Sequence, residues 1–124
     1  MKKEKGVGYC GLSCANCAKN DICDGCHQIK PEEKYWCENL RCCLEKGYNG
    51  CWECADFPCQ GSMLDKLKIR AFATLIKEQG EQAFLNHLQR NEQNGVEYLK
   101  KGSNSGDYDA FESTEEILQF IKNN

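Results

Sequence analysis

CANCAKNDICDGC, residues 14–26, contains two Cys-x-x-Cys pairs separated by five residues. A Cys-x-x-Cys turn directs two sulfurs toward one point, and two such turns supply the four ligands of a tetrahedral zinc site with Zn–S distances of about 2.3 Å. Gly25 lies inside the second turn and tolerates the positive φ that suits a backbone wrapped closely around a metal. A third pair, Cys51 and Cys54, follows in the same half of the chain. The spacing therefore predicts a fold organised around bound metal.

The distribution of cysteines divides the chain into two unlike halves. All 11 cysteines of the 124 residues lie between Cys10 and Cys59. Residues 1–61 are poor in aliphatic side chains, and a segment this short buries too little apolar surface to fold without staples. Structural zinc supplies folding free energy on the order of 10 kcal/mol in small finger peptides. We expect a mainly α fold with irregular metal-bound loops, in which a cysteine-rich half (residues 1–61) packs on a helical half (residues 62–124) as one integrated domain.

Ten of the cysteines are candidate metal ligands, and eight of them would fill two closed zinc sites. Such sites are structural, because four thiolates leave no open position for water or substrate. One pool of ligands is Cys10, Cys14, Cys17, Cys23 and Cys26, and the other is Cys37, Cys43, Cys51, Cys54 and Cys59. Crossing of ligands between the pools, as in interleaved zinc folds, stays open.

Cys42 and His27 each lie next to a candidate ligand in the sequence. Residues 38–46 predict a short helix that ends at Gly47, and adjacent Cys42 and Cys43 would point about 100° apart on it. Cys43 shares a face with Leu40 and Leu44, which favours Cys43 as the ligand. His27 directly follows a candidate ligand, Cys26, and a solvated or outer position is favoured for it over direct ligation.

The second half predicts three amphipathic helices. The first runs from a cap at Ser62 to about Gln79 and stops at Gly80. The second covers EQAFLNHLQRNEQN and stops at Gly95, and the third begins at a capping box, STEE, whose first residue is Ser113. Their expected inward residues are Leu64, Leu67, Ala71, Phe72, Leu75, Ile76, Phe84, Leu85, Leu88, Ile117, Phe120 and Ile121.

The sequence GDYD, residues 106–109, places Asp107 and Asp109 on either side of Tyr108. Two carboxylates at this spacing could bind a divalent cation or act as an acid and a base, which makes them a secondary candidate site. Such a stretch is more often a turn whose aspartates accept hydrogen bonds from backbone donors. The turn interpretation is favoured.

Charge and hydropathy exclude several classes of partner. The formal net charge is −3 and no cluster of lysine and arginine stands out, so a nucleic-acid partner is not expected. No stretch approaches the roughly 18 consecutive apolar residues of a membrane span. The basic start has no apolar run after it, so we expect no signal peptide and a cytoplasmic location. Thiols stay reduced there, which favours metal binding over disulfides.

The motifs YCGLSCANC, CDGC, LRCCLEKG and CWECADFPC, with the tail from GEQAFLNHLQRNEQNG to GDYD, together resemble a prokaryotic cysteine-rich family of unknown function. Its pattern begins CGLxCxxC, continues through CxGC and closes with CxxC followed by PC, and its members are expected to bind zinc. Cys37 matches this pattern less securely and Cys42 is extra. The resemblance names no reaction. It implicates as metal ligands Cys10, Cys14, Cys17, Cys23, Cys26, Cys43, Cys51, Cys54 and Cys59.

The resulting hypothesis is a zinc-scaffolded binding or regulatory module, with two ions, no catalysis of its own, and a protein or small molecule as partner. The main alternative is an iron–sulfur electron-transfer or sensor protein, because tetrahedral sulfur ligation suits both metals. A thiol-redox or metal-relay role for spare cysteines such as Cys42 or Cys10 is a third. The C-x3-C-x2-C spacing of residues 10–17 also occurs in radical enzymes, but no barrel pattern follows it, and Asn16 stands where those enzymes usually have an aromatic residue.

Overall fold

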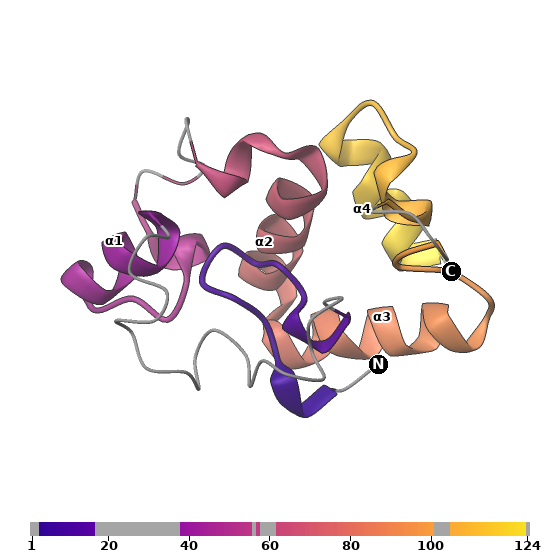
Figure 1. Cartoon of the computed structure of the whole chain (residues 1–124), viewed down its shortest axis with the longest axis horizontal. Helices are drawn as coiled ribbons and strands as arrows, with labels where there is room; N and C mark the ends of the chain where they lie inside the picture. The colour runs from indigo at the N-terminus through magenta and orange to yellow at the C-terminus, as the bar shows by residue number, and fades with distance from the viewer. Residues whose placement is uncertain (1–2, 17–37, 56, 58–61, 101–104, 124) are drawn as a thin grey trace.

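The computed structural model describes residues 3–16, 38–55, 57, 62–100 and 105–123 (Figure 1). The α-helices in these ranges are α1 (Glu38–Lys46), α2 (Leu67–Gln79), α3 (Glu81–Gln93) and α4 (Thr114–Asn123). Single 3-10 turns accompany them: η1 (Lys3–Lys5), η2 (Cys14–Asn16), η4 (Cys51–Glu53), η5 (Met63–Asp65) and η6 (Asp107–Asp109). Extended pairing within the described ranges is limited to one isolated bridge between Val7 and Ser13. The mainly helical fold expected from the sequence is confirmed.

Helix α2 lies between α1 and α4 (Figure 1) and contributes to two hydrophobic clusters. Phe72, Leu75 and Ile76 pack with buried residues of α3 and α4 in one of them, which we call the helical core. Ile69 and Ala73 belong to the other, which we call the cysteine-side cluster. Its buried members are Cys10, Cys43, Cys51, Leu64, Ile69 and Ala73. The cysteine-rich half therefore packs on the helical half through α2, as expected.

Aromatic rings and one buried amide organise the helical core. The ring of Phe72 lies 5.0 Å from that of Phe84 and 5.7 Å from that of Tyr108, measured between centroids. Asn91 of α3 is fully buried, and its Nδ2 donates to Tyr108 Oη at 3.2 Å and to the carbonyl oxygen of Ile121 at 3.1 Å. Because a buried amide is costly to leave unpaired, these bonds fix η6 and α4 against α3.

Several helix boundaries follow the sequence prediction. Helix α1 covers residues 38–46, and Gly47 after it has a positive φ of 73°. Gly80 and Gly95, at φ 93° and 96°, follow α2 and α3 closely. Before α4, Ser113 Oγ accepts a hydrogen bond from the backbone N–H of Glu116 at 3.2 Å, as a capping box requires.

The start of α2 differs from the prediction of one continuous helix from Ser62. The Ser62 hydroxyl does act as a cap, accepting from Leu64 N at 3.2 Å, but the turn that it caps is η5. Lys66 is then extended, with φ −78° and ψ 126°, and α2 begins only at Leu67. Arg70 Nε donates to the carbonyl oxygen of Leu64 at 2.9 Å and fixes this corner.

Because of this corner, apolar residues that the sequence pattern assigned to one helix face differ in their burial and in the cluster that they join. Leu64 is buried in the cysteine-side cluster beside Ile69, whereas Leu67 is only half-buried. A second correction concerns α1, where Leu44 is 38% exposed although it was expected to share the inward face of Cys43. Leu40 and Cys43 are buried as predicted.

The loop that carries Cys10 lies directly against α2. Gly11 has φ 100°, and a Cβ atom added there would lie 3.0 Å from the backbone nitrogen of Ala73.

Gly11→Ala is therefore expected to lower the free energy of unfolding by about 2 kcal/mol or more, through an unfavourable φ and a backbone clash. Gly47→Ala is the matched control, since φ is 73° but no atom lies within 4 Å, and about 1 kcal/mol is expected. Denaturant titration of both variants measures the difference, and equal losses would contradict the close packing of this loop.

Candidate metal centre

Two buried cysteines, one on α1 and one at the start of η4, are in contact. Cys43 lies on the inward face of α1 and is 2% exposed, and Cys51 begins η4 and is 5% exposed. Their Sγ atoms are 3.8 Å apart. A disulfide needs a separation of about 2.05 Å, so the two sulfurs are in contact without being bonded.

The distance between these sulfurs is compatible with ligation of one metal ion by both. In a tetrahedral site with Zn–S distances of about 2.3 Å, any two ligand sulfurs lie about 3.8 Å apart. Cys43 and Cys51 are therefore spaced as one edge of such a tetrahedron. The donor set and its spacing fit zinc, and they equally suit iron in a sulfur-ligated site.

Local backbone geometry brings the two cysteines together. Helix α1 ends at Lys46, the positive φ of the following Gly47 reverses the chain, and Tyr48 N donates to the carbonyl oxygen of Cys43 at 2.9 Å. Cys51 N then donates to the carbonyl oxygen of Tyr9 at 2.7 Å. The N-terminal loop is thereby joined to η4, and Cys10 enters the same cluster as Cys43 and Cys51. The sequence assigns Cys10 to the other pool of ligands, and the partition of the ligands between the two sites stays a prediction.

The other described cysteines have distinct surroundings. Cys54 follows η4, is 7% exposed, and donates its backbone N–H to the carbonyl oxygen of Cys51 at 3.1 Å. Lys46 Nζ lies 4.0 Å from Cys54 Sγ. Cys14 is buried in η2. Cys42 is half-buried beside buried Cys43, as expected for adjacent positions on a helix.

The sulfur pair is electrostatically asymmetric. The hydrogen bond from the Cys43 thiol lowers the pKa of Cys51 to about 7, although burial raises it. The Asn39 amide and the Lys46 ammonium also lower the pKa of Cys51. The same hydrogen bond, followed by burial and the charge on Cys51, raises the pKa of Cys43. The lowered pKa of Cys51 makes its thiolate, the form that binds metal, more accessible near neutral pH than that of an ordinary buried cysteine.

Half of the predicted ligands lie outside the described residues. These are Cys17, Cys23, Cys26, Cys37 and Cys59, and His27 lies there as well. Within the described ranges, no three or more cysteine, histidine, aspartate or glutamate side chains come together in a group that could hold a metal ion. The described part of the centre is the Cys43–Cys51 pair with its neighbours.

The aspartates of the GDYD sequence accept hydrogen bonds from backbone donors. Asp107 Oδ2 accepts from Glu97 N at 2.8 Å, and its Oδ1 lies 3.5 Å from Lys100 Nζ. Asp109 Oδ2 accepts a backbone N–H three residues earlier at 2.8 Å, and its Oδ1 lies 3.1 Å from Lys68 Nζ. Fixed donors occupy both carboxylates, as the turn interpretation predicts.

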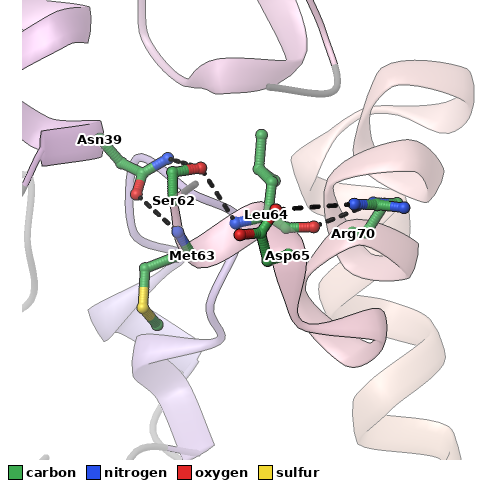
Figure 2. A network of polar contacts seen from close by, with 6 residues as sticks. All are labelled: Asn39, Ser62, Met63, Leu64, Asp65 and Arg70. Atoms are coloured by element: carbon green, nitrogen blue, oxygen red, sulfur yellow. Dashed lines mark hydrogen bonds and ion pairs between the residues drawn. The ribbon is translucent and has the colours of Figure 1, made fainter. Parts of the chain in front are cut away.

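Asn39 is a functional candidate that the sequence analysis missed. Its side chain is 4% exposed, and its Nδ2 donates to Cys51 Sγ at 3.2 Å and to Ser62 Oγ at 3.4 Å. Its Oδ1 accepts from Met63 N at 3.2 Å (Figure 2). The signal that could have found it is its spacing from Cys43, since residues i and i+4 share a helix face.

Comparison with known proteins found a family model that matches the segment containing Cys43 and Cys51. Residues 18–63 match a family described as "Protein of unknown function (DUF3795)". This segment contains α1, η4 and the Cys43–Cys51 pair, and the match confirms the resemblance to a family of unknown function. Comparisons with curated proteins and with solved structures found no match. None of the helices in the described part of the chain has the length and apolar character needed to cross a membrane.

Proposed function

We propose that this protein binds zinc through cysteine thiolates, and that the metal is structural in a binding or regulatory module without catalysis of its own. The observation that carries the proposal is the pair of buried sulfurs, Cys43 and Cys51, held at the edge length of a tetrahedral thiolate site. Buried polar groups need partners, and a cation between these sulfurs would neutralise a charge that the surrounding cluster cannot solvate.

The proposed first site takes Cys43 and Cys51 as two ligands and Cys54 as the third, because Cys54 completes a Cys-x-x-Cys turn and is also buried. Cys10, which shares the cysteine-side cluster, or a cysteine outside the described ranges supplies the fourth. A second ion takes its ligands from the two Cys-x-x-Cys pairs of residues 14–26. Both sites would be closed, which is why a structural role is proposed.

The proposed partner is a protein or a small molecule. The acidic balance of the chain, with a formal net charge of −3, disfavours a polyanion such as nucleic acid. Thiolate ligation would add negative charge to this balance, since each four-thiolate zinc site carries a net charge of −2. We further propose a cytoplasmic location, because thiols remain available for metal in a reducing compartment.

Elemental analysis of the native protein and of two cysteine variants tests the proposal. We expect two zinc ions per chain in the native protein and one in Cys51→Ser, because serine is a poor zinc ligand. Cys42→Ser is the matched control: it changes the residue beside a proposed ligand, and we expect it to keep both ions. Equal metal content in Cys51→Ser and the native protein would exclude Cys51 as a ligand.

The colour of the protein distinguishes the two candidate metals in the same preparation. Zinc thiolate protein is colourless because Zn²⁺ has a filled d shell. Brown, iron-containing protein purified without air would overturn the zinc proposal in favour of an iron–sulfur protein. Native protein without bound metal would overturn both.

A further inference from the structure

We propose that Asn39 is a positioning residue of this metal site: its side-chain amide donates a hydrogen bond to the Cys51 thiolate, holds the sulfur in place and reduces the electron density that it offers the metal. The inference rests on the proposed function. Its structural basis is the contact of 3.2 Å between Asn39 Nδ2 and Cys51 Sγ, in which both side chains are buried.

The orientation of the Asn39 amide follows from its other partner. A backbone N–H can only donate, so the side-chain atom that faces Met63 N at 3.2 Å must be the carbonyl oxygen (Figure 2). The NH₂ group then has to face Cys51 and Ser62. A thiolate can only accept, which matches an N–H donor at this position.

A connected set of contacts holds the backbone that fixes this amide (Figure 2). Ser62 Oγ accepts from Leu64 N at 3.2 Å, and Arg70 Nε donates to the carbonyl oxygen of Leu64 at 2.9 Å. Arg70 also pairs with Asp65 at 4.0 Å. Rotation of Asn39 would break its bond to η5, so the amide is preorganised toward the sulfur. The metal ligand is thereby linked to the corner that starts α2.

A hydrogen bond to a metal-bound thiolate affects both its geometry and its electronic properties. Outer partners that orient ligands typically change metal affinity about 10–100-fold when they are mutated. The bond also lowers the energy of the sulfur lone pairs, so transfer of charge from sulfur to an open-shell metal needs more energy. Loss of the Asn39 donor should shift such an absorption band to lower energy, and it should weaken metal binding because the sulfur is no longer held in position.

Asn39→Asp separates these effects from simple misfolding. Aspartate has the same shape and keeps an acceptor for Met63 N, but it presents oxygen instead of N–H to Cys51. In protein loaded with Co²⁺ we expect a sulfur-to-cobalt band at lower energy, and zinc competition should show an affinity about 10–100-fold weaker. Asn39→Leu removes the donor without adding charge and should shift the band in the same direction.

Ser62→Ala is the matched control, because it removes the cap of η5 and one Asn39 contact but leaves the contact to sulfur. We expect its band and zinc affinity to equal those of the native protein, and far-ultraviolet circular dichroism checks the fold of every variant. An unshifted band and native affinity in Asn39→Asp would overturn this inference while the proposed function stands. Equal weakening in Ser62→Ala and Asn39→Asp without a band shift would overturn it too. Native protein that binds no metal would overturn both.

Discussion

Removal of the proposed zinc with a chelator is expected to abolish most of the near-ultraviolet circular dichroism of the cysteine-rich half, while much of the far-ultraviolet helix signal remains. Among the described residues, the buried members of the cysteine-side cluster include two large aliphatic side chains, Leu64 and Ile69. Bound zinc supplies folding free energy on the order of 10 kcal/mol in small domains, which this cluster cannot replace by burial. The helical core contains no cysteine among its buried members in the described ranges and should persist.

Trp52 is the natural reporter for this experiment, because it packs against both clusters and sits between Cys51 and Cys54. Addition of zinc to the chelated protein should restore the near-ultraviolet signal, which controls for irreversible damage. An unchanged near-ultraviolet spectrum after complete removal of metal, verified by elemental analysis, would show that the metal is not the scaffold.

Phe72→Ala is expected to be the most destabilising single substitution in the helical half, lowering the free energy of unfolding by about 3–5 kcal/mol. Phe72 is fully buried on α2, and its ring lies within 5.0–6.1 Å of the rings of Phe84, Tyr98 and Tyr108, between centroids. Truncation would leave a cavity at the junction of three helices and η6. Urea unfolding followed by circular dichroism at the helix wavelength measures the loss.

Phe120→Ala provides the comparison for this prediction. Phe120 has the same side chain, with its ring 5.6 Å from that of Tyr108, but it is only half-buried at the edge of the core. A smaller loss is expected because its site can collapse or be filled by water. Metal content should stay unchanged in both variants, since neither residue belongs to the cysteine-side cluster. A loss in Phe120→Ala equal to that in Phe72→Ala would refute the central role of Phe72.

The sequence correctly predicted the elements that are fixed by interactions between residues close together in the chain. Helix α1 and its stop at Gly47 follow from an apolar face and a glycine with positive φ. The capping box at Ser113 is equally local, because its hydrogen bond spans three residues. The preference for Cys43 over Cys42 as the inward cysteine also holds, since a helix of known register assigns a face to each residue.

The structure differs from the sequence prediction where contacts between distant segments outweigh the local preference for a helix. The corner at Lys66 interrupts a regular helical pattern because Leu64 is buried against the cysteines while Arg70 bonds back to its carbonyl oxygen. The role of Asn39 depends on contacts to residues 12 and 24 positions away, which no window of periodicity contains. The Cys-x-x-Cys pairs can be recognised in the sequence, but the contacts of Cys51 with Cys43 and Asn39 across the fold could not be predicted from it.

Under the proposed zinc binding, the packing of both faces of α2 would link the lifetime of the chain to the supply of zinc. Ile69 and Ala73 face the cysteines, while Phe72 and Leu75 on the same helix face α3 and α4. If zinc dissociates, α2 keeps one packed face and remains helical, but its openings become more frequent, because a ligand that binds only the native state stabilises that state by mass action. Proteases act on such openings. The lifetime of the chain in the presence of proteases would therefore rise with the concentration of available zinc. Its steady-state abundance would rise with it.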